Sequence, residues 1–335
     1  MALAAASVGV GPASAATQRT VRTKAQWQAA IAQVPERGTG CYHASYPALQ
    51  WHQVKCVAAP RWPVVPARRP GSPRHTAIAT IGNGHDYSAK VSGLISKATG
   101  SFHHVSPTIT EKGKVGNAGS KVANAFSLQL NTQFFASPAC SGSSDPAKCL
   151  GWQQFVYAYE SGTGLLFMQY WLINYAATCP SGWFTYSADC YTNSSASTLS
   201  PLKARQLAHT KLAGSATSGG NDTVSLTVGS GQATLVSNGD SMVDLAAFWN
   251  TTEWGAFGDG GGGEAFFGAN TSLEAQTVLK ATSSSAPTCV SEGFTGETTN
   301  LSLTTTPALG SEPSPTMASK QTNGTTGTPS CAVAR

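Results

Sequence analysis

Charged side chains are scarce in this chain. It has 21 Lys or Arg and 16 Asp or Glu among 335 residues, 11% of the sequence, against ~25% in an average soluble domain. This shortage argues against a helical, Lys/Glu-rich cytosolic protein. Long apolar runs are lacking too, since none reaches the ~18 residues that a membrane-spanning helix needs. With 41% hydrophobic residues, the composition predicts a soluble globular protein with no membrane span.

Positive charge is confined to the beginning of the chain. Residues 1–75 contain nine Lys or Arg and one acidic residue, whereas the remaining 260 contain 12 basic and 15 acidic residues. The bulk of the fold therefore lacks the excess of basic residues that nucleic-acid binding requires. We expect no nucleic-acid partner.

Sequence motifs of several common chemistries are also missing. The chain has no HExxH, no GxSxG, no P-loop and no EF-hand loop. The glycine run 258–263 is followed by strand-like residues, so it predicts a wide turn and not a phosphate-binding loop, which needs a helix start. Asp259 lies within this turn and Glu264 follows it, but two carboxylates make a poor calcium site. No metal and no cofactor is predicted.

Eight cysteines form an even set without CxxC spacing, which indicates disulfides in an exported protein. Residues 1–16 are a candidate signal-peptide remnant, because Ala13-Ser14-Ala15 has the small-x-small pattern of a cleavage site. The expected location is secreted and extracellular. Short spacings favour the local pairs Cys41–Cys56, Cys140–Cys149 and Cys179–Cys190, with Cys289–Cys331 closing the tail. Buried free thiols are the alternative.

Residues 17–75 form a basic, propeptide-like arm. A helix-like pattern within 18–40 is followed at 57–75 by five prolines, four arginines and a histidine. Such a composition predicts an exposed linker, with Arg68-Arg69 and Arg74 as candidate processing sites; an ordinary solvated linker is the alternative. At the other end, residues 303–335 are rich in Ser, Thr, Pro and Gly and predict a loose tail that Cys331 tethers.

Residues 76–302 contain many short segments with alternating or β-branched and aromatic residues, separated by Gly/Asn/Asp turn formers. The clearest predicted strands are 125–130, 153–159, 165–174, 223–228, 233–237 and 273–279. Only 199–213 has a helical pattern. We predict an all-β fold, an antiparallel two-sheet β-sandwich of jelly-roll, concanavalin A-like type with a short N-terminal arm, in a monomeric protein.

Two segments combine polar and aromatic residues and are the candidates for a binding or catalytic cleft, although the pattern of the glutamines alone favours a solvated sheet surface. Residues 151–175 predict an aromatic hairpin with Gln153 and Gln154 on opposite faces of one strand and Gln169 on the return strand. Such amides either lie on the wet face of a sheet or line a cleft. Glu253 is flanked by Trp249 and Trp254, where a carboxylate is either a general acid/base or an exposed strand residue.

From about residue 86 to 280, the order of elements resembles the glutamic peptidase (eqolisin) family. The pieces that carry the resemblance are residues 92–102, the hairpin with Gln153 and Gln169, and Asn250-Thr251-Thr252-Glu253-Trp254, which is similar to the family's Asn-Ala-Glu-aromatic segment. The chain departs from the family at Gln169, where a Glu is usual. It also has residues 126–131 in place of the Trp-Val-Gly-x-Asp-Gly segment.

The resemblance implies a secreted acid endopeptidase, made with a removable basic propeptide, that acts on polypeptides. It implies Gln153 and Glu253 as the catalytic pair and Trp152, Gln169, Trp171, Trp249 and Trp254 as substrate-binding residues. In such a mechanism, Glu253 takes a proton from water and returns it to the leaving nitrogen, and Gln153 stabilises the oxyanion.

Two other functions remain open. A carbohydrate-binding or glucanase-like sandwich would stack a polysaccharide on the tryptophans and Tyr170. No two carboxylates lie two residues apart on one predicted strand, which favours a lectin-like binder over a glycosidase. The last alternative is a non-catalytic extracellular protein.

Overall fold

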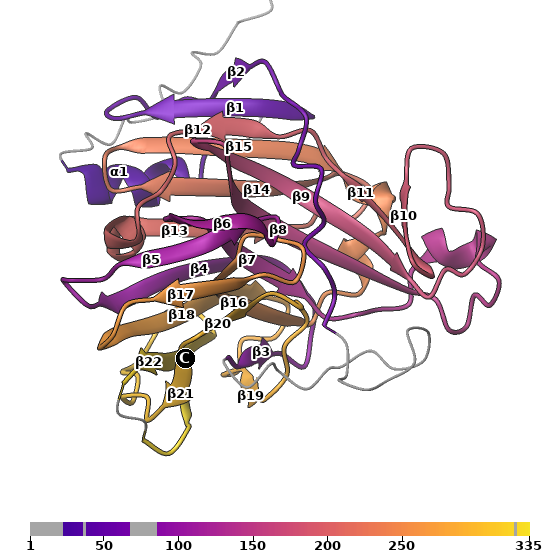
Figure 1. The fold of residues 1–335 in the computed structure, drawn as a ribbon. Coiled ribbons are helices and arrows are strands. Elements are labelled where there is room, and N and C mark those ends of the chain that lie inside the picture. The colour runs from indigo at the N-terminus through magenta and orange to yellow at the C-terminus, as the bar shows by residue number, and fades with distance from the viewer. Residues whose placement is uncertain (1–22, 36–37, 68–85, 325–326) are drawn as a thin grey trace, which may run out of the picture.

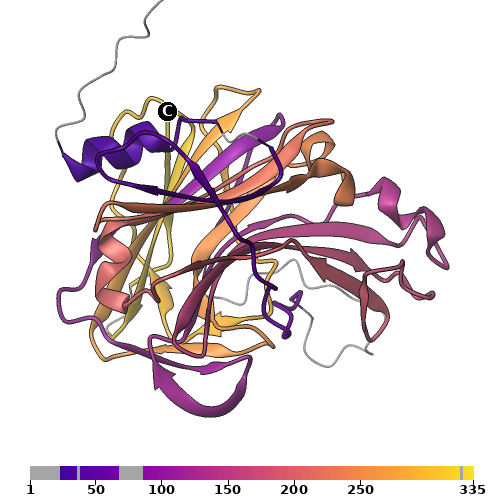
Figure 2. The same cartoon turned by 90° about the horizontal axis from the view of Figure 1, so that it is seen from above.

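The computed structural model describes residues 23–35, 38–67, 86–324 and 327–335. The proposed signal remnant and the three candidate processing arginines lie outside these ranges. Two large antiparallel sheets pack against each other (Figures 1 and 2), which confirms the all-β sandwich. No helix in the described part of the chain is long and apolar enough to cross a membrane.

One sheet has ten strands. In spatial order these are β2 (His52–Val54), β1 (Gly40–Ser45), β15 (Gln232–Gly239), β14 (Asn221–Val228), β13 (Thr210–Ser215), β4 (Ile95–Val105), β18 (Thr271–Ala281), β22 (Thr316–Asn323) and β21 (Ser302–Thr304), with β23 (Cys331–Ala334) also on β22. The N-terminal arm thus builds one edge of the sheet. The C-terminal residues form strands near the other edge, so the expected loose tail is wrong.

The second large sheet has nine strands. In spatial order they are β10 (Phe184–Tyr186), β11 (Asp189–Asn193), β9 (Thr163–Ile173), β8 (Leu150–Glu160), β7 (Phe126–Thr132), β16 (Thr251–Gly258), β3 (Ser88–Lys90) and β19 (Thr288–Val290), with β12 (Ser197–Leu199) also on β9. A small third sheet contains β20 (Thr298–Thr299), β17 (Glu264–Phe267), β5 (Glu111–Val115) and β6 (Ala118–Ala123). The predicted hairpin is β8 and β9.

Helical structure is limited. Helix α1 (Lys24–Ile31) begins at a Thr23 capping box and buries Trp27 and Ile31, as its sequence pattern predicts. The short 3₁₀ helices are η1 (Pro138–Gly142), η2 (Ala204–His209), η3 (Asp240–Met242) and η4 (Leu245–Ala247). The helical expectation for 199–213 is therefore correct only over η2, because the residues after it pair with β4 and β14 as β13.

The main core lies between the two large sheets and includes Phe155, Trp249 and Trp254. The Trp254 ring lies directly over Gly100 of β4. A Cβ at that position would come within 2.1 Å of the Trp254 ring. The close packing of β16 on β4 therefore depends on glycine at position 100.

All four predicted disulfides are confirmed, and no described cysteine is free. Three of them close short local loops. The fourth, Cys289–Cys331, joins β19 of the nine-stranded sheet to β23 of the ten-stranded sheet. It therefore links the two layers of the sandwich covalently.

Candidate functional site

A row of polar side chains crosses five strands on the outer face of the nine-stranded sheet. The strand register aligns one residue from each of β16, β7, β8, β9 and β11: Glu253, Asn131, Gln154, Gln169 and Asn193. Partners in register share a face of the sheet. The first four are fully buried and Asn193 is half-buried. We call these five residues the polar row.

Hydrogen bonds join the polar row from end to end. Gln154 Nε2 donates to Asn131 Oδ1 over 3.1 Å, and Asn131 Nδ2 donates to Glu253 Oε2 over 2.8 Å. Toward the other end, Gln169 Nε2 donates to Asn193 Oδ1 over 2.7 Å. The indole of Trp171 lies within hydrogen-bonding distance of both glutamine oxygens. The donors that start at Gln154 thus end on the carboxylate of Glu253.

Glu253 forms a carboxyl pair with Asp86. Asp86 precedes β3 by two residues, and Ser88 of β3 is in register with Glu253, so the two carboxyls are diagonal neighbours. Glu253 Oε2 accepts hydrogen bonds from the amides of Phe294 and Thr295. Its Oε1 and both oxygens of Asp86 have no donor within the described residues.

Burial, and then the nearby charge of Glu253, raise the pKa of Asp86 well above its usual range. Asp86 is therefore protonated in acid. Its hydrogen can lie on the otherwise unpartnered Oε1 of Glu253. The pair then shares one proton, so that one carboxyl group can act as an acid while the other acts as a base.

A second group of buried carboxyls lies where β16 ends, and consists of Glu111, Asp259 and Glu297. Burial is the main cause that raises the pKa of Glu111 and of Asp259 to about 8, and that of Glu297 to about 7. Within the described ranges, no three His, Cys, Asp or Glu side chains are placed to hold a metal ion.

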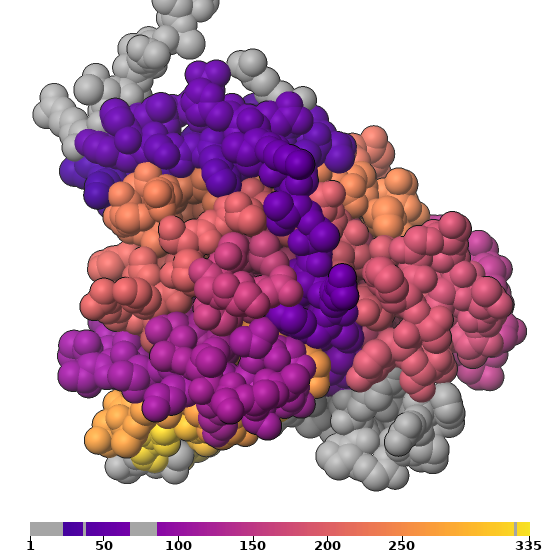
Figure 3. Space-filling view, turned by 45° about the horizontal axis from the view of Figure 1, so that its top comes forward, coloured from indigo at the N-terminus to yellow at the C-terminus, as the bar shows by residue number. Residues whose placement is uncertain are grey.

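Residues 57–67, which we call the strap, lie over the polar row at Gln169 and Asn193, whereas Phe294 and Thr295 contact its Glu253 end. Figure 3 shows this indigo segment running down the face of the molecule between the magenta and salmon parts of the chain. Val64 N donates to Gln169 Oε1 over 2.8 Å, and Asn193 Nδ2 donates to Pro60 O over 3.4 Å. Val64 is 1% exposed and Val65 is 8% exposed. The exposed linker expected here is therefore wrong over residues 62–67, which are buried or half-buried, whereas Val57, Ala58 and Arg61 are exposed.

The structure brings four of the seven predicted site residues to the outer face: Glu253, Trp152, Gln169 and Trp171. Gln153 points the other way, between the sheets, where its Nε2 donates to Asp222 Oδ2 over 2.8 Å. The structure does not bring Gln153 to Glu253. The glutamine of β8 that shares the face of Glu253 is Gln154, two strands away.

Trp249 and Trp254 are also interior residues. The Trp249 ring packs on Phe155, and Trp254 Nε1 donates to Ser101 O in the opposite sheet. Trp254 follows Glu253 on β16, and successive residues of a strand point to opposite faces, so Trp254 points away from the outer face. Trp249 precedes β16, and its buried position in the main core keeps it from a cleft on the outer face. Their assignment as substrate-binding residues is corrected accordingly.

The seven predicted site residues did not include Asp86, Asn131, Gln154 or Asn193. A signal for Asn131 was present, since Ser127, Gln129 and Asn131 alternate with apolar residues along β7 and form a polar stripe with linked side chains. Asp86 stands outside every periodic segment, and no pattern pointed to it.

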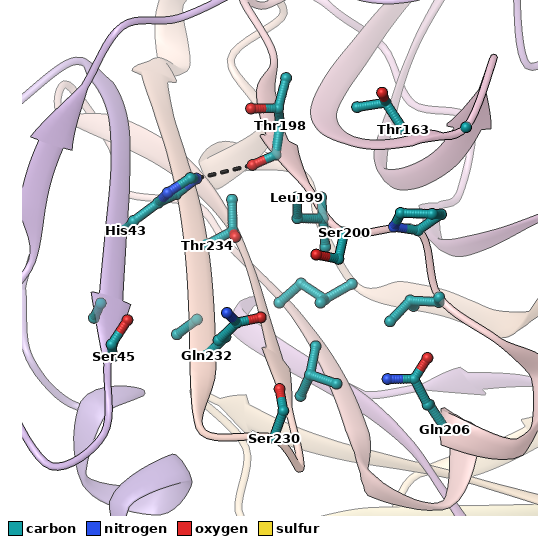
Figure 4. Close-up of a pocket in the computed structure, with 17 residues that line it drawn as sticks. His43, Ser45, Thr163, Thr198, Leu199, Ser200, Gln206, Ser230, Gln232 and Thr234 are labelled. Carbon is teal, nitrogen blue, oxygen red and sulfur yellow. Dashed lines mark hydrogen bonds between the residues drawn. The ribbon is translucent and has the colours of Figure 1, made fainter.

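An open cavity of about 520 Å³ lies elsewhere, between β1, β15, β12 and η2 (Figure 4). Hydroxyl and amide groups line it together with aliphatic side chains such as Leu226 and Val228, and His43 Nε2 lies 2.9 Å from Thr198 O. Its lining includes no carboxylate and no residue of the polar row. It is therefore a separate feature from the carboxyl pair.

Fold and site together define a β-sandwich that carries the carboxyl pair and the polar row on one outer face. The strap, an N-terminal segment, lies over part of that row. No family model, no curated protein and no solved structure matches the chain.

Proposed function

We propose that this chain is a secreted acid endopeptidase of glutamic type, latent while the strap covers the polar row. One observation carries the proposal. The carboxyl pair and the polar row share one face of the sheet, and the Gln169–Asn193 end of the row already holds a peptide segment, the strap, through backbone hydrogen bonds. The four disulfides support an oxidising, extracellular location.

The carboxyl pair supplies both proton transfers of amide hydrolysis. Ionised Glu253 accepts a proton from water as the water oxygen attacks the peptide carbonyl. The tetrahedral intermediate then breaks its C–N bond, and the leaving nitrogen takes a proton from the pair, with Asp86 as the second proton carrier. The products are one carboxylic acid and one amine.

The side-chain amides of the polar row supply N–H donors on the face of the carboxyl pair. Gln154 replaces Gln153 as the candidate for oxyanion stabilisation, because its side chain is on the face of Glu253. Asn131 holds the carboxylate at Oε2 and so leaves Oε1 for the shared proton. The row therefore positions the base and polarises the bond to be cleaved.

Casein hydrolysis by the full chain, with and without preincubation at pH 4, tests the proposal. Mass spectrometry should detect cleavage within residues 57–85 and then degradation of casein, with activity at pH 3–5. Glu253→Gln should abolish both. Full activity of that variant, or an inert wild-type chain even after cleavage in this region, would contradict the proposal.

Polysaccharide binding is the second candidate, and the cavity in Figure 4 favours it. Uncharged hydroxyl and amide groups suit a neutral sugar more than a peptide substrate of an acid–base site. Cosedimentation with an insoluble polysaccharide separates this candidate from the first. Loss of binding in Gln232→Ala with casein hydrolysis unchanged would assign the cavity to a glycan.

A further inference from the structure

The strap has the spacing of a polyproline II ligand. Pro60, Pro63 and Pro66 recur at every third residue, and proline fixes φ near the value of that helix, which has three residues per turn. The chain bends at Arg61 and Trp62 and then runs from Pro63 to Val65 outside any helix or strand. A polyproline II segment has no internal hydrogen bonds, so its backbone groups are available to a partner surface.

The surface under the strap uses those backbone groups. Gly261 N donates to Pro63 O, Gly296 N donates to Val65 O, and Val65 N donates to Glu297 Oε1 over 3.0 Å. Val64 N donates to Gln169, as described above. Backbone groups of three successive strap residues, 63–65, are thus hydrogen-bonded to side chains and loops of the sandwich. These bonds do not depend on which side chains the segment carries.

Two apolar pockets receive the adjacent valines. Val64 packs in a cluster with Val156, Ala158, Leu165, Phe167 and Ala196. Val65 packs in an aromatic cluster with Trp152, Trp171, Ile173, Tyr191 and Phe294. On β8 and β9, Gln154 and Gln169 lie between the residues of the two clusters. The Val64–Val65 peptide bond therefore crosses the polar row.

The glycine run 258–263 builds the remaining wall. Gly260 has φ +81°, and a Cβ there would lie 2.4 Å from the Trp62 ring; a Cβ at Gly116 would lie 2.8 Å from the same ring. Gly261, with φ +63°, directs its N–H to Pro63 O. The turn is thus shaped around the Trp62 side chain and the strap backbone.

We propose that the face over the polar row is a binding groove for extended, proline-rich peptides with two adjacent aliphatic residues, and that the strap is its tethered occupant. The inference rests on the proposed function only in taking such peptides as the substrate class. Aromatic-lined grooves are the usual recognition surface for proline-rich segments. The Val64 and Val65 pockets then determine specificity on the two sides of the polar row.

A binding assay that needs no catalysis tests the groove. The protein is the full chain with Glu253→Gln, compared with the same chain carrying Val64→Asp and Val65→Asp to weaken the strap. The probe is a fluorescent peptide with the sequence of residues 60–67. Since a tethered segment competes at a high effective concentration, the strap-weakened chain should bind the peptide about 10-fold or more tightly than its parent.

Two control peptides define specificity. One replaces both valines by aspartate and should not bind, and the other replaces the three prolines by alanine and should bind about 5-fold or more weakly, since it loses the preset conformation. Equal affinity of all three peptides, or of both chains, would overturn the inference.

The strap substitutions could instead unfold the chain, so Val64→Ala with Val65→Ala is the milder second variant. If both variants lose cooperative thermal unfolding, the strap is part of the core and the inference is overturned. If the probe binds as expected but the chain with Glu253 intact does not hydrolyse it, the groove stands and the proposed function falls.

Discussion

Asn131 donates a hydrogen bond from Nδ2 to Glu253 Oε2 over 2.8 Å, across the β7–β16 pair. Two backbone amides, of Phe294 and Thr295, donate to the same oxygen. All donors to Glu253 in the described structure are therefore on one side of the carboxylate, and the other oxygen is turned to Asp86.

Removing either carboxyl should abolish hydrolysis. We expect Glu253→Gln and Asp86→Asn to lower kcat for casein at pH 4 by about 100-fold or more, the usual contribution of a general acid or base. Asp145→Asn is the matched control, because Asp145 is a partly exposed carboxylate that contacts Lys148 and the Ala147 amide, far from the polar row in sequence. Near-normal kcat in Asp86→Asn would remove Asp86 from the mechanism, and circular dichroism would show whether each variant is folded.

The two neighbouring glutamines of β8 should have different roles. Gln154→Ala should reduce kcat at pH 4 and leave KM less affected. Gln153→Ala should keep activity but lower the free energy of unfolding by about 1–3 kcal/mol, because it removes the donor to buried Asp222. Urea unfolding and casein kinetics on both variants separate the effects. The reverse outcome would restore Gln153 as the catalytic amide.

Stability should fall as pH rises from about 4 to about 8. The pKa of Asp222 is also raised to about 8, chiefly by burial, as for Glu111 and Asp259. A carboxyl with a raised pKa keeps its proton longer in the folded state. Its contribution to stability is therefore complete below its unfolded pKa near 4 and is lost as pH passes its folded pKa.

Differential scanning calorimetry should give a Tm at pH 9 that is lower than at pH 4.5 by more than about 5 °C, a change of a few kcal/mol. Asp259→Asn should flatten this dependence, since it removes one of the titrating groups. Maximal stability at pH 7–8 with unfolding by pH 4 would contradict the expectation.

Gly260→Ala should loosen the strap without unfolding the sandwich. The new methyl group would require a left-handed φ for alanine and would collide with the Trp62 ring. We expect faster tryptic cleavage after the exposed Arg61, with the global Tm lowered by only a few degrees. Gly219→Ala has a similar φ with open space around it and serves as the control. Equal cleavage rates in the two variants would show that Trp62 does not anchor the strap.

The sequence predicted the strands well because residues of β14, β15 and β18 alternate or are β-branched. It could not predict which glutamine faces Glu253. Every residue from Gly151 to Ala158 of β8 is buried, with one glutamine on each face, so the alternation that identifies an outer face is lost. Gln153 points inward because it shares a face of β8 with Phe155, and Phe155 packs on Trp249 in the core. That contact joins segments almost a hundred residues apart.

The strap was misjudged for a related reason. Prolines and arginines are typical of solvated linkers, and no local pattern shows that distant strands supply pockets for Val64 and Val65. The disulfides, in contrast, were predictable, because three of the pairs close short loops and the fourth is then fixed.

The Cys41–Cys56 bridge has a consequence for processing. It lies wholly on the N-terminal side of the strap, and the other three bridges join later residues to each other. A cut between residues 67 and 86 would thus yield two polypeptides with no covalent link. Under native conditions the two polypeptides would stay associated through the six paired residues of β1 and β15. On a denaturing gel they would separate even without reductant. The N-terminal fragment would therefore stay bound to the sandwich. Its strap would act as a reversible inhibitor that leaves the polar row and returns to it within the same complex.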